Sequence, residues 1–458
     1  MDAHVLWSLR LGFSSKQAER IKKNGLERYL KDSFAKPRVS MPDFTKGWPK
    51  TPTEVSEMNR KFTGDEGRRE ARVIRDEGNL ALKAWWIDRM RGQELPLREK
   101  MTLFWHNHYV AAFNKVSVNY WLLDHNMALR ENAFGNFREL TKIMLRTNML
   151  VRYLDNNSNV KGKFNENLSR ELLELFTLGI GNYTEQDIKN GAMGLAGLTV
   201  GDAGAVYRPS KENEEPIVYF GKKGKFKADD MVDIIFKQKN APYHITRKLL
   251  KWFIYDDPPE KLVTYYGDLL REKDFEIQPL LMKMFTEEFG KVTAGSKIKD
   301  PLSFILQLLH EFDAKPISSR MVAQFVKLQG MDLFNQPNVK GWNGGNYWLS
   351  PQIYSQRQNL ADLLCTKVVN SRRVKIFAQE GSDALEKLTV NPAWDRSGNN
   401  KSIIADLSNR LLFNVDSNLQ ADLENMLRHD FDPKAKGAEN GVMRLLNFMI
   451  RTPEFQLI

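Results

Sequence analysis

Residues 164–179, FNENLSRELLELFTLG, predict an amphipathic helix. Asparagine-rich polar residues precede its apolar positions and Gly179 follows them, as expected at the start and end of a helix. At roughly 100° per residue, the apolar side chains fall on one arc of the helix. That arc consists of Leu168, Leu172, Leu175, Phe176 and Leu178. A helix of this kind buries its arc against other helices, so the stretch points to a mainly α-helical fold.

One carboxylate lies inside this apolar arc. Glu166, Arg170 and Glu174 follow each other at i, i+4 on the opposite face, where a solvated ladder of charges is expected. Glu171 instead falls between two leucines of the arc. A buried carboxylate must find a cation, a metal or hydrogen-bond donors, or take up a proton. We therefore expect Glu171 to be mostly buried and to contact the helix predicted over 96–114.

The helix over 96–114 carries the run FWHNHYV at 104–110. His108 falls in the middle of its apolar stripe, whereas His106 points about 160° away from it on a regular helix. An H-x-H pair chelates one metal readily from a strand but poorly from a regular helix. A regular helix therefore leaves at most one of these histidines for a site shared with Glu171, and His108 is the better candidate.

Amphipathic segments recur along nearly the whole chain, and strand signals are few. Two β-prone runs flank a polar turn within 205–223 and predict a hairpin. We predict a mainly α protein, one large multi-helical domain with a small β-hairpin insert. The favoured division has two packed helical lobes, 1–200 and 229–458, separated by the insert at 201–228. A loop rich in Gly, Asn and Trp at 341–351 belongs to the second lobe.

Composition excludes several classes of protein. The 458 residues are 42% hydrophobic and 27% charged, and no apolar run reaches the ~18 to 20 residues of a membrane span. The net charge is +11, but the lysines are spread among many acidic residues, which argues against nucleic-acid binding. The single cysteine, Cys365, excludes an intrachain disulfide framework and a multi-thiolate zinc site. The opening residues lack a signal peptide, which predicts a cytoplasmic protein; the alternative is an exported protein whose leader was removed.

Three blocks of sequence make the chain resemble a large bacterial family. FWHNHYV (104–110), NENLSRELLELFTLG (165–179) and GWNGGNYWLSPQIYSQR (341–357) are similar to signature blocks of the domain of unknown function 1800, in the same order. The family has no established activity. Many members carry export signals, often of the twin-arginine type, and are encoded beside an alkaline-phosphatase-like family. The resemblance therefore implies an alkaline-phosphatase-like protein as a partner.

The chain departs from the family pattern twice. It has no export signal, and SKENEEPIVYFGK (210–222) stands where relatives usually have a His-Asp-x-Gly-x-Lys segment. The missing histidine and aspartate weaken the expectation that an ancestral site is intact.

Two classes of function remain open. The first is a metal-assisted or acid–base enzyme, with His106 or His108 as base or ligand and Glu171 as a second ligand of a divalent metal. Around this centre, further polar residues would bind or position the substrate: Asn165, Glu166, Asn167 and Arg170. The second class is a non-catalytic helical scaffold or partner-binding protein, in which a Glu171–His108 or Glu171–Arg contact locks helices together. The indoles of Trp342 and Trp348 are either packed in their loop or form a platform for a ligand.

Overall fold

Helices dominate the computed structural model, which describes residues 1–35, 39–367 and 387–458. They make up 62% of the chain and confirm the expected mainly α fold. In the first half, the α-helices are α1 (Ala3–Leu11), α2 (Ala18–Asn24), α3 (Leu26–Phe34), α4 (Pro52–Lys61), α5 (Gly64–Gly92), α6 (Leu97–His108), α7 (Phe113–Val116), α8 (Asn119–Glu131), α9 (Phe137–Leu145), α10 (Asn148–Tyr153), α11 (Asn167–Glu171) and α12 (Glu185–Leu195).

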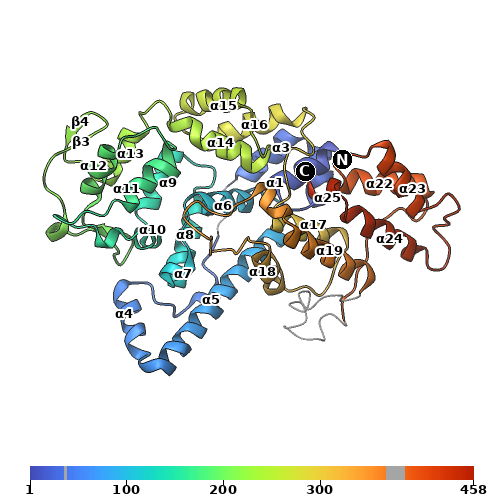
Figure 1. Cartoon of the computed structure of the whole chain (residues 1–458), viewed down its shortest axis with the longest axis horizontal. Helices are drawn as coiled ribbons and strands as arrows, with labels where there is room; N and C mark the ends of the chain where they lie inside the picture. The colour runs from blue at the N-terminus through green and yellow to red at the C-terminus, as the bar shows by residue number, and fades with distance from the viewer. Residues whose placement is uncertain (36–38, 368–386) are drawn as a thin grey trace.

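The second half continues in the same way. Its α-helices are α13 (Ala228–Ile235), α14 (Ala241–Phe253), α15 (Glu260–Glu272), α16 (Ile277–Phe289), α17 (Pro301–Glu311), α18 (Ser319–Leu328), α19 (Pro351–Thr366), α22 (Asn400–Leu411), α23 (Ser417–Met426), α24 (Ala438–Ile450) and α25 (Pro453–Gln456). Figure 1 shows α9 to α13 at one end of an elongated molecule and α22 to α24 at the other, with α6 between them. The helix α4 and the first part of α5 project from the body.

Two small antiparallel sheets lie within and just before the predicted β insert at 201–228. Strand β1 (Leu198–Thr199) pairs with β2 (Val206–Tyr207), and β3 (Ile217–Tyr219) pairs with β4 (Lys222–Gly224). The predicted β insert is therefore present, but its pairing differs, because the two β-prone runs of 205–223 each pair with a nearer neighbour. Phe220 and Gly221 have φ values of 46° and 76°. Positive φ at both positions is typical of the two-residue turn whose twist matches that of the paired strands. This turn closes β3 onto β4.

The N-terminal helix packs against the second half of the chain. The Arg10 guanidinium on α1 donates to Thr293 Oγ1 at 2.6 Å and to the carbonyl oxygens of Thr293 and Ile254. The main chains of Lys297 and Ile458 also pair with each other, which ties the C-terminal residue to the segment between α16 and α17. Figure 1 marks both ends of the chain within the body of the molecule. The division into lobes at 1–200 and 229–458 stays a prediction, and the Arg10 contacts cross it.

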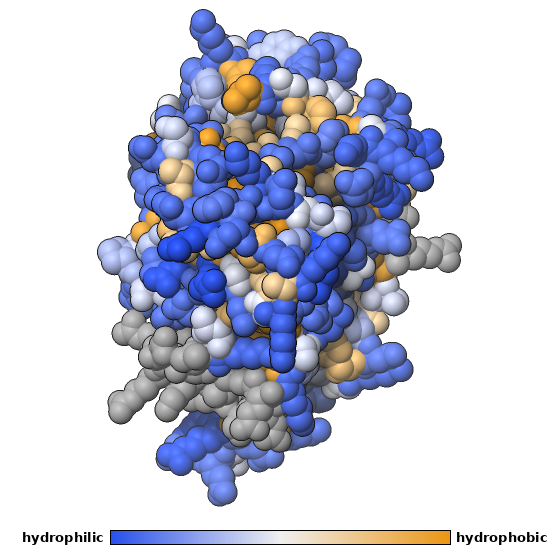
Figure 2. All heavy atoms as spheres, turned by 90° about the vertical axis from the view of Figure 1, so that its right-hand side faces the viewer, coloured by the Kyte–Doolittle hydropathy of each residue, from blue (hydrophilic) through white to orange (hydrophobic). Residues whose placement is uncertain are grey.

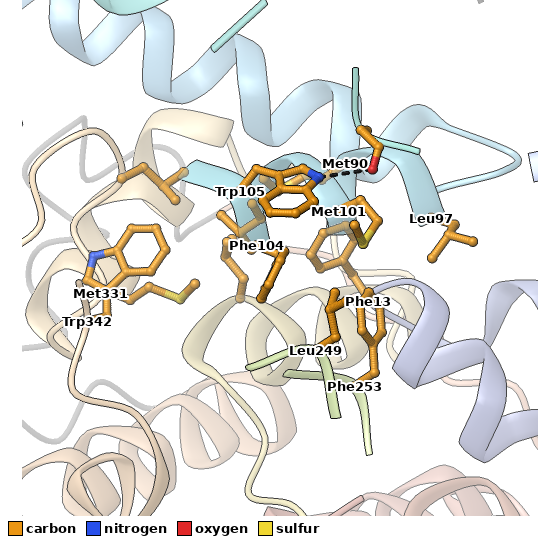
Figure 3. Close-up of a cluster of buried hydrophobic side chains, with 14 of the residues drawn as sticks. Phe13, Met90, Leu97, Met101, Phe104, Trp105, Leu249, Phe253, Met331 and Trp342 are labelled. Atoms are coloured by element: carbon orange, nitrogen blue, oxygen red, sulfur yellow. Dashed lines mark hydrogen bonds between the residues drawn. The ribbon is translucent and has the colours of Figure 1, made fainter. Parts of the chain in front are cut away.

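The core is built around α6, which is buried along nearly its whole length. Figure 3 shows side chains from distant parts of the chain meeting there. They include Phe13, Met90, Met101, Phe104, Trp105, Leu249, Phe253, Met331 and Trp342. Trp105 Nε1 donates to the carbonyl oxygen of Ala133 at 2.9 Å. A helix surrounded on all sides holds the residues at its end in fixed positions, which matters for the site below.

The first turn of α6 buries three consecutive charged side chains, and each has partners. The Arg98 guanidinium donates to the carbonyl oxygens of Phe34, Ala35 and Arg130. The Glu99 carboxylate accepts hydrogen bonds from Arg130, Arg89 and Trp86 Nε1, and the Lys100 ammonium binds Asp300 and Ser303. Burying a charge is tolerated only with such partners. The triplet therefore fixes α6 against its neighbours rather than facing solvent.

The molecular surface in Figure 2 is predominantly hydrophilic, with apolar side chains scattered over it. Across the described residues, none of the helices combines the length and the hydropathy that crossing a membrane would require.

Candidate functional site

The three residues at the C-terminal end of α6 face three different neighbourhoods. The His106 ring packs edge-on against Trp86 and Phe334, and the His108 ring lies beside Phe176. Between them, Asn107 Oδ1 accepts the backbone N–H of Trp342 at 2.8 Å. The helix is regular up to His108. The two histidines are consequently separated, as expected for a regular helix.

His106 is fully buried, and neither ring nitrogen has a hydrogen-bond partner among the described residues. Its pKa is lowered well below its usual range, first by burial and then by His125 and Arg130. The His125 ring lies 6.0 Å away, centroid to centroid, and its Nε2 is bonded to the carbonyl oxygen of Tyr109. The imidazole of His106 is therefore neutral and acts as an aromatic core residue.

The helix that contains Glu171 changes its winding. After α11, residues Leu172–Thr177 form a π-helical turn. The N–H of Leu178 reaches the carbonyl oxygen of Leu173, five residues back, at 2.9 Å. Such turns insert one extra residue into a helix and occur frequently at functional sites. The widened turn rotates all later residues relative to the regular helix assumed from the sequence.

At the end of this turn, two carbonyl oxygens accept hydrogen bonds from basic side chains, of which His108 is buried and the other two are half-buried. The carbonyl oxygen of Phe176 accepts from His108 Nε2 at 3.0 Å, and that of Leu175 accepts from His244 Nε2 at 3.0 Å. Lys248 Nζ donates to the same Leu175 oxygen at 3.2 Å and to His108 Nδ1 at 3.0 Å. These contacts join α6, α14 and the π-helical turn. We call His108, His244 and Lys248 the basic triad.

The hydrogen bonds fix the protonation of the basic triad. A carbonyl oxygen only accepts, so Nε2 of His108 carries the hydrogen and Nδ1 accepts from the ammonium. Burial lowers the pKa of His108 well below its usual range and that of His244 to about 4. Burial also lowers the pKa of Lys248 to about 8. No carboxylate of the described chain forms an ion pair with Lys248 Nζ, which leaves burial unopposed.

Glu171 lies away from this triad. Its side chain is half-buried, and its pKa is raised, first by burial and then by the nearby Glu174 carboxylate. Within the described ranges, Glu171 forms neither an ion pair nor a hydrogen bond with His108. The physical reason is the π-helical turn, which begins one residue after Glu171. It buries Leu173, which the regular wheel left outside the arc, and leaves Leu175 half-buried.

The polar residues around Glu171 build the start of the helix. Asn165 Oδ1 accepts the N–H of Asn167, and Asn165 Nδ2 donates to Ser158 Oγ. The Arg170 guanidinium bridges the carboxylates of Glu166 and Glu185, at 3.0 Å in each case. These are turn and surface contacts. The structure does not bring Arg170, Glu166 or the two asparagines to the triad.

The indoles of the 341–351 loop are buried, with 5% of Trp342 and 3% of Trp348 exposed. Trp342 Nε1 donates to the carbonyl oxygen of Asp332 at 3.2 Å. Both rings pack inside the protein, so a ligand platform on their faces would require the loop to open.

The described chain contains no group of three or more His, Cys, Asp and Glu side chains that could hold a metal ion. His108 also has both ring nitrogens engaged, one by a carbonyl oxygen and one by an ammonium. A divalent ion at His108 and Glu171 would have to displace Lys248 and bridge two side chains that are not in contact.

Sequence reasoning missed Lys248, although a signal was present. In RKLLKWF (247–253), Lys248 lies three residues after Ile245 and four before Trp252, on the apolar side of α14. The same test that singled out Glu171 would have singled out this lysine.

A family model described as "Protein of unknown function (DUF1800)" matches residues 4–457. The chain belongs to this family. Neither the curated proteins nor the solved structures contain a match. The DUF1800 match spans α6, the π-helical turn and α14, so all three members of the basic triad lie inside the family domain.

Proposed function

We propose that this protein is an acid–base enzyme in which the neutral amine of Lys248 acts as the general base. The observation that supports the proposal is the position of its Nζ, bonded to two neutral acceptors and paired with no carboxylate of the described chain. A lysine used for a structural ion pair stays charged at neutral pH. A lysine with a pKa of about 8 is partly neutral there, and catalytic bases are tuned in this way.

The geometry also directs the amine. An ammonium has three donors, and two of them are used by His108 Nδ1 and the Leu175 carbonyl oxygen. The third position carries either a hydrogen or, after proton loss, the lone pair. Because the two acceptors fix the rotation about the terminal bond, the lone pair has one defined direction. A substrate proton would be taken up there, and His108 would act as a positioning residue.

The reactivity of the Lys248 amine provides a direct test of the proposed chemistry. Competitive labelling of the whole protein with limiting acetic anhydride, from about pH 6 to about pH 10, measures how fast each lysine is acylated relative to exposed lysines. Mass spectrometry of the peptides locates the label. We expect Lys248 to react with a midpoint near pH 8. His108→Phe, which removes the acceptor at Nδ1 but keeps a ring, should change both the midpoint and the rate.

Lys100 provides a matched control, because it is a buried lysine whose ammonium binds the Asp300 carboxylate at 3.2 Å. It should stay unlabelled while Lys248 reacts. A Lys248 that is unreactive over the whole pH range, or that titrates with the exposed lysines, would refute the proposal.

A scaffold function is the second candidate, and one observation favours it. The basic triad caps the C-terminal end of a helix, where carbonyl oxygens lack partners and positive charge is favourable. The same hydrogen bonds would then serve to lock α6, α14 and the π-helical turn together. In that case Lys248→Met would lower stability, and the labelling experiment would find no reactive amine.

A further inference from the structure

A cavity of about 810 Å³ lies beside α5, and no member of the basic triad lines it. Its walls are α5, α18, the segment 113–117 and the segment 332–335. Hydrogen bonds make its floor rigid: Asn335 Oδ1 accepts the N–H of Asn114 at 3.2 Å, and Asn335 Nδ2 donates to Asp332 Oδ2 at 3.1 Å. Neither the triad nor the proposed chemistry involves this space.

Helix α5 contributes a stripe of hydrogen-bond donors to the cavity wall. The stripe runs at helical spacing through Arg68, Arg72, Arg75, Asn79 and Lys83. At 1.5 Å of rise per residue, its last three members are about 6 Å apart along the axis. Arginine and lysine cannot accept hydrogen bonds, and only the asparagine offers an oxygen. A wall of this composition suits a ligand rich in acceptors.

The charges around the cavity do not cancel. Five cationic side chains line it, including Lys327 on α18, against three carboxylates. Those three carboxylates already have partners. Asp76 lies 3.6 Å from Arg72, Glu77 binds Arg320, and Asp332 binds Lys83 and lies 4.0 Å from Lys327. Arg68 pairs with Asp65, which lies outside the lining. Arg75 is left over: its Nη1 donates to the neutral Asn59 Oδ1 at 3.3 Å, and no described carboxylate lies within ion-pair distance.

One turn further along α5, Asn79 forms part of the cavity wall, and only 4% of its surface is exposed. Its Nδ2 has no hydrogen-bond partner among the described residues. Leaving a buried donor unsatisfied costs free energy, so such a group calls for a partner that the chain does not itself provide. The unpaired Arg75 and the unsatisfied Asn79 are neighbours at i, i+4 on the same wall.

We propose that this cavity binds a small molecule with adjoining oxyanion groups, of the diphosphate type. Arg75 and Asn79 would donate to the anionic oxygens, and Lys83 and Lys327, which share the single Asp332 carboxylate, would add the remaining positive charge. A guanidinium matches the geometry of phosphate oxygens with two parallel donors. Because the donors are spread over two helical turns, a ligand with two anionic groups satisfies more of them than one with a single group.

Isothermal titration of the full chain with inorganic pyrophosphate tests this site. We expect one saturable site per chain, and Arg75→Gln should weaken binding by about tenfold or more, as loss of a charged hydrogen bond does. Asn79→Leu, which keeps the volume and removes the donor, should weaken binding by about threefold or more. Arg396→Gln is the matched control, since Arg396 is an exposed arginine outside the cavity. It should bind as the wild type does, and circular dichroism should show the same fold in all variants.

Three results would overturn the proposal. The first is absence of saturable pyrophosphate binding. The second is equal weakening by Arg75→Gln and Arg396→Gln, which would mean diffuse attraction to a basic surface. The third is binding of duplex DNA or an acidic peptide through Arg75 without binding of pyrophosphate, which would make the wall a macromolecular interface. None of these outcomes depends on Lys248, so the experiment tests this site independently of the proposed acid–base function.

Discussion

Lys248 Nζ lies 3.0 Å from Nδ1 of His108, so that two basic side chains share one hydrogen where a carboxylate would ordinarily be found. Both groups lose part of their affinity for protons on burial. The pair stays neutral at lower pH than either side chain would in water. The protonation of this pair as a function of pH is therefore the property of the site that an experiment can measure most directly.

The first prediction concerns stability at alkaline pH. The pKa of Lys248 falls from 10.5 in the unfolded chain to about 8 in the folded protein, so the unfolded state binds more protons between these values. Stability should rise with pH in that window by up to about 3 kcal/mol, whereas the cost of burying the charge is fully present below pH 8. Urea unfolding of the wild type and Lys248→Met measures it. A difference between the two that is flat from pH 8 to 10.5 would contradict the assignment.

Acid should destabilise the protein through its buried neutral histidines. The pKa values of His125 and His244 are lowered to about 4, chiefly by burial. The unfolded state takes up protons first, so stability is retained above about pH 6.5 and falls as the pH drops towards 4. The slope of unfolding free energy against pH should be shallower in His125→Gln. Equal slopes in the wild type and the variant would show that His125 is already charged in the folded state.

Glu171→Gln should leave stability unchanged or raise it slightly at neutral pH, since burial and then the Glu174 carboxylate disfavour the Glu171 charge. A structural ion pair predicts the opposite, a loss of several kcal/mol. Thermal unfolding with and without a chelator completes the test. If chelation lowers the melting temperature of the wild type and not that of the variant, Glu171 is a metal ligand after all.

The contact between Asn107 and the 341–351 loop should leave no room for a methyl group added at Gly341. Gly341 has a φ of 93°, and a Cβ added there would overlap the Asn107 side chain. Gly341→Ala combines strain with a clash and should cost about 2 kcal/mol or more. Gly345→Ala is the control, because Gly345 also has positive φ but has open space around it, and it should cost about 1 kcal/mol. Equal losses, measured by urea unfolding, would mean that Asn107 moves aside freely.

Periodicity predicted the mainly α fold because most helices here are regular and amphipathic, so a local pattern reports burial. Periodicity led to wrong expectations where a side chain is buried by residues that are distant in the sequence. The run of Arg98, Glu99 and Lys100 has the composition of a solvated face, yet distant partners such as Asp300 and Arg130 bury it. Two β-prone runs were expected to pair with each other, and the turn at Phe220 and Gly221 closed one of them on a nearer strand instead.

The candidate site shows the same limit. His108 was found on the apolar stripe of its helix, and the regular helix separated it from His106 as expected. A helical wheel with a constant 100° per residue places Glu171 in the apolar arc, and hydrophobic periodicity does not reveal the π-helical turn that begins one residue later. Lys248 was detectable by the same wheel. Its pairing with His108, 140 residues away, is a property of the tertiary fold.

Because the turn at Leu172–Thr177 contains one extra residue, a change in its length should disturb this helix more than a substitution within it. Deleting one residue there would restore regular i→i−4 bonding without breaking the helix. It would also rotate everything that follows by about 100°, withdrawing the Leu175 and Phe176 carbonyl oxygens from their imidazoles. Apolar exchanges within the turn preserve that register. Related chains that keep the basic triad should therefore differ here by substitution and not by insertion or deletion.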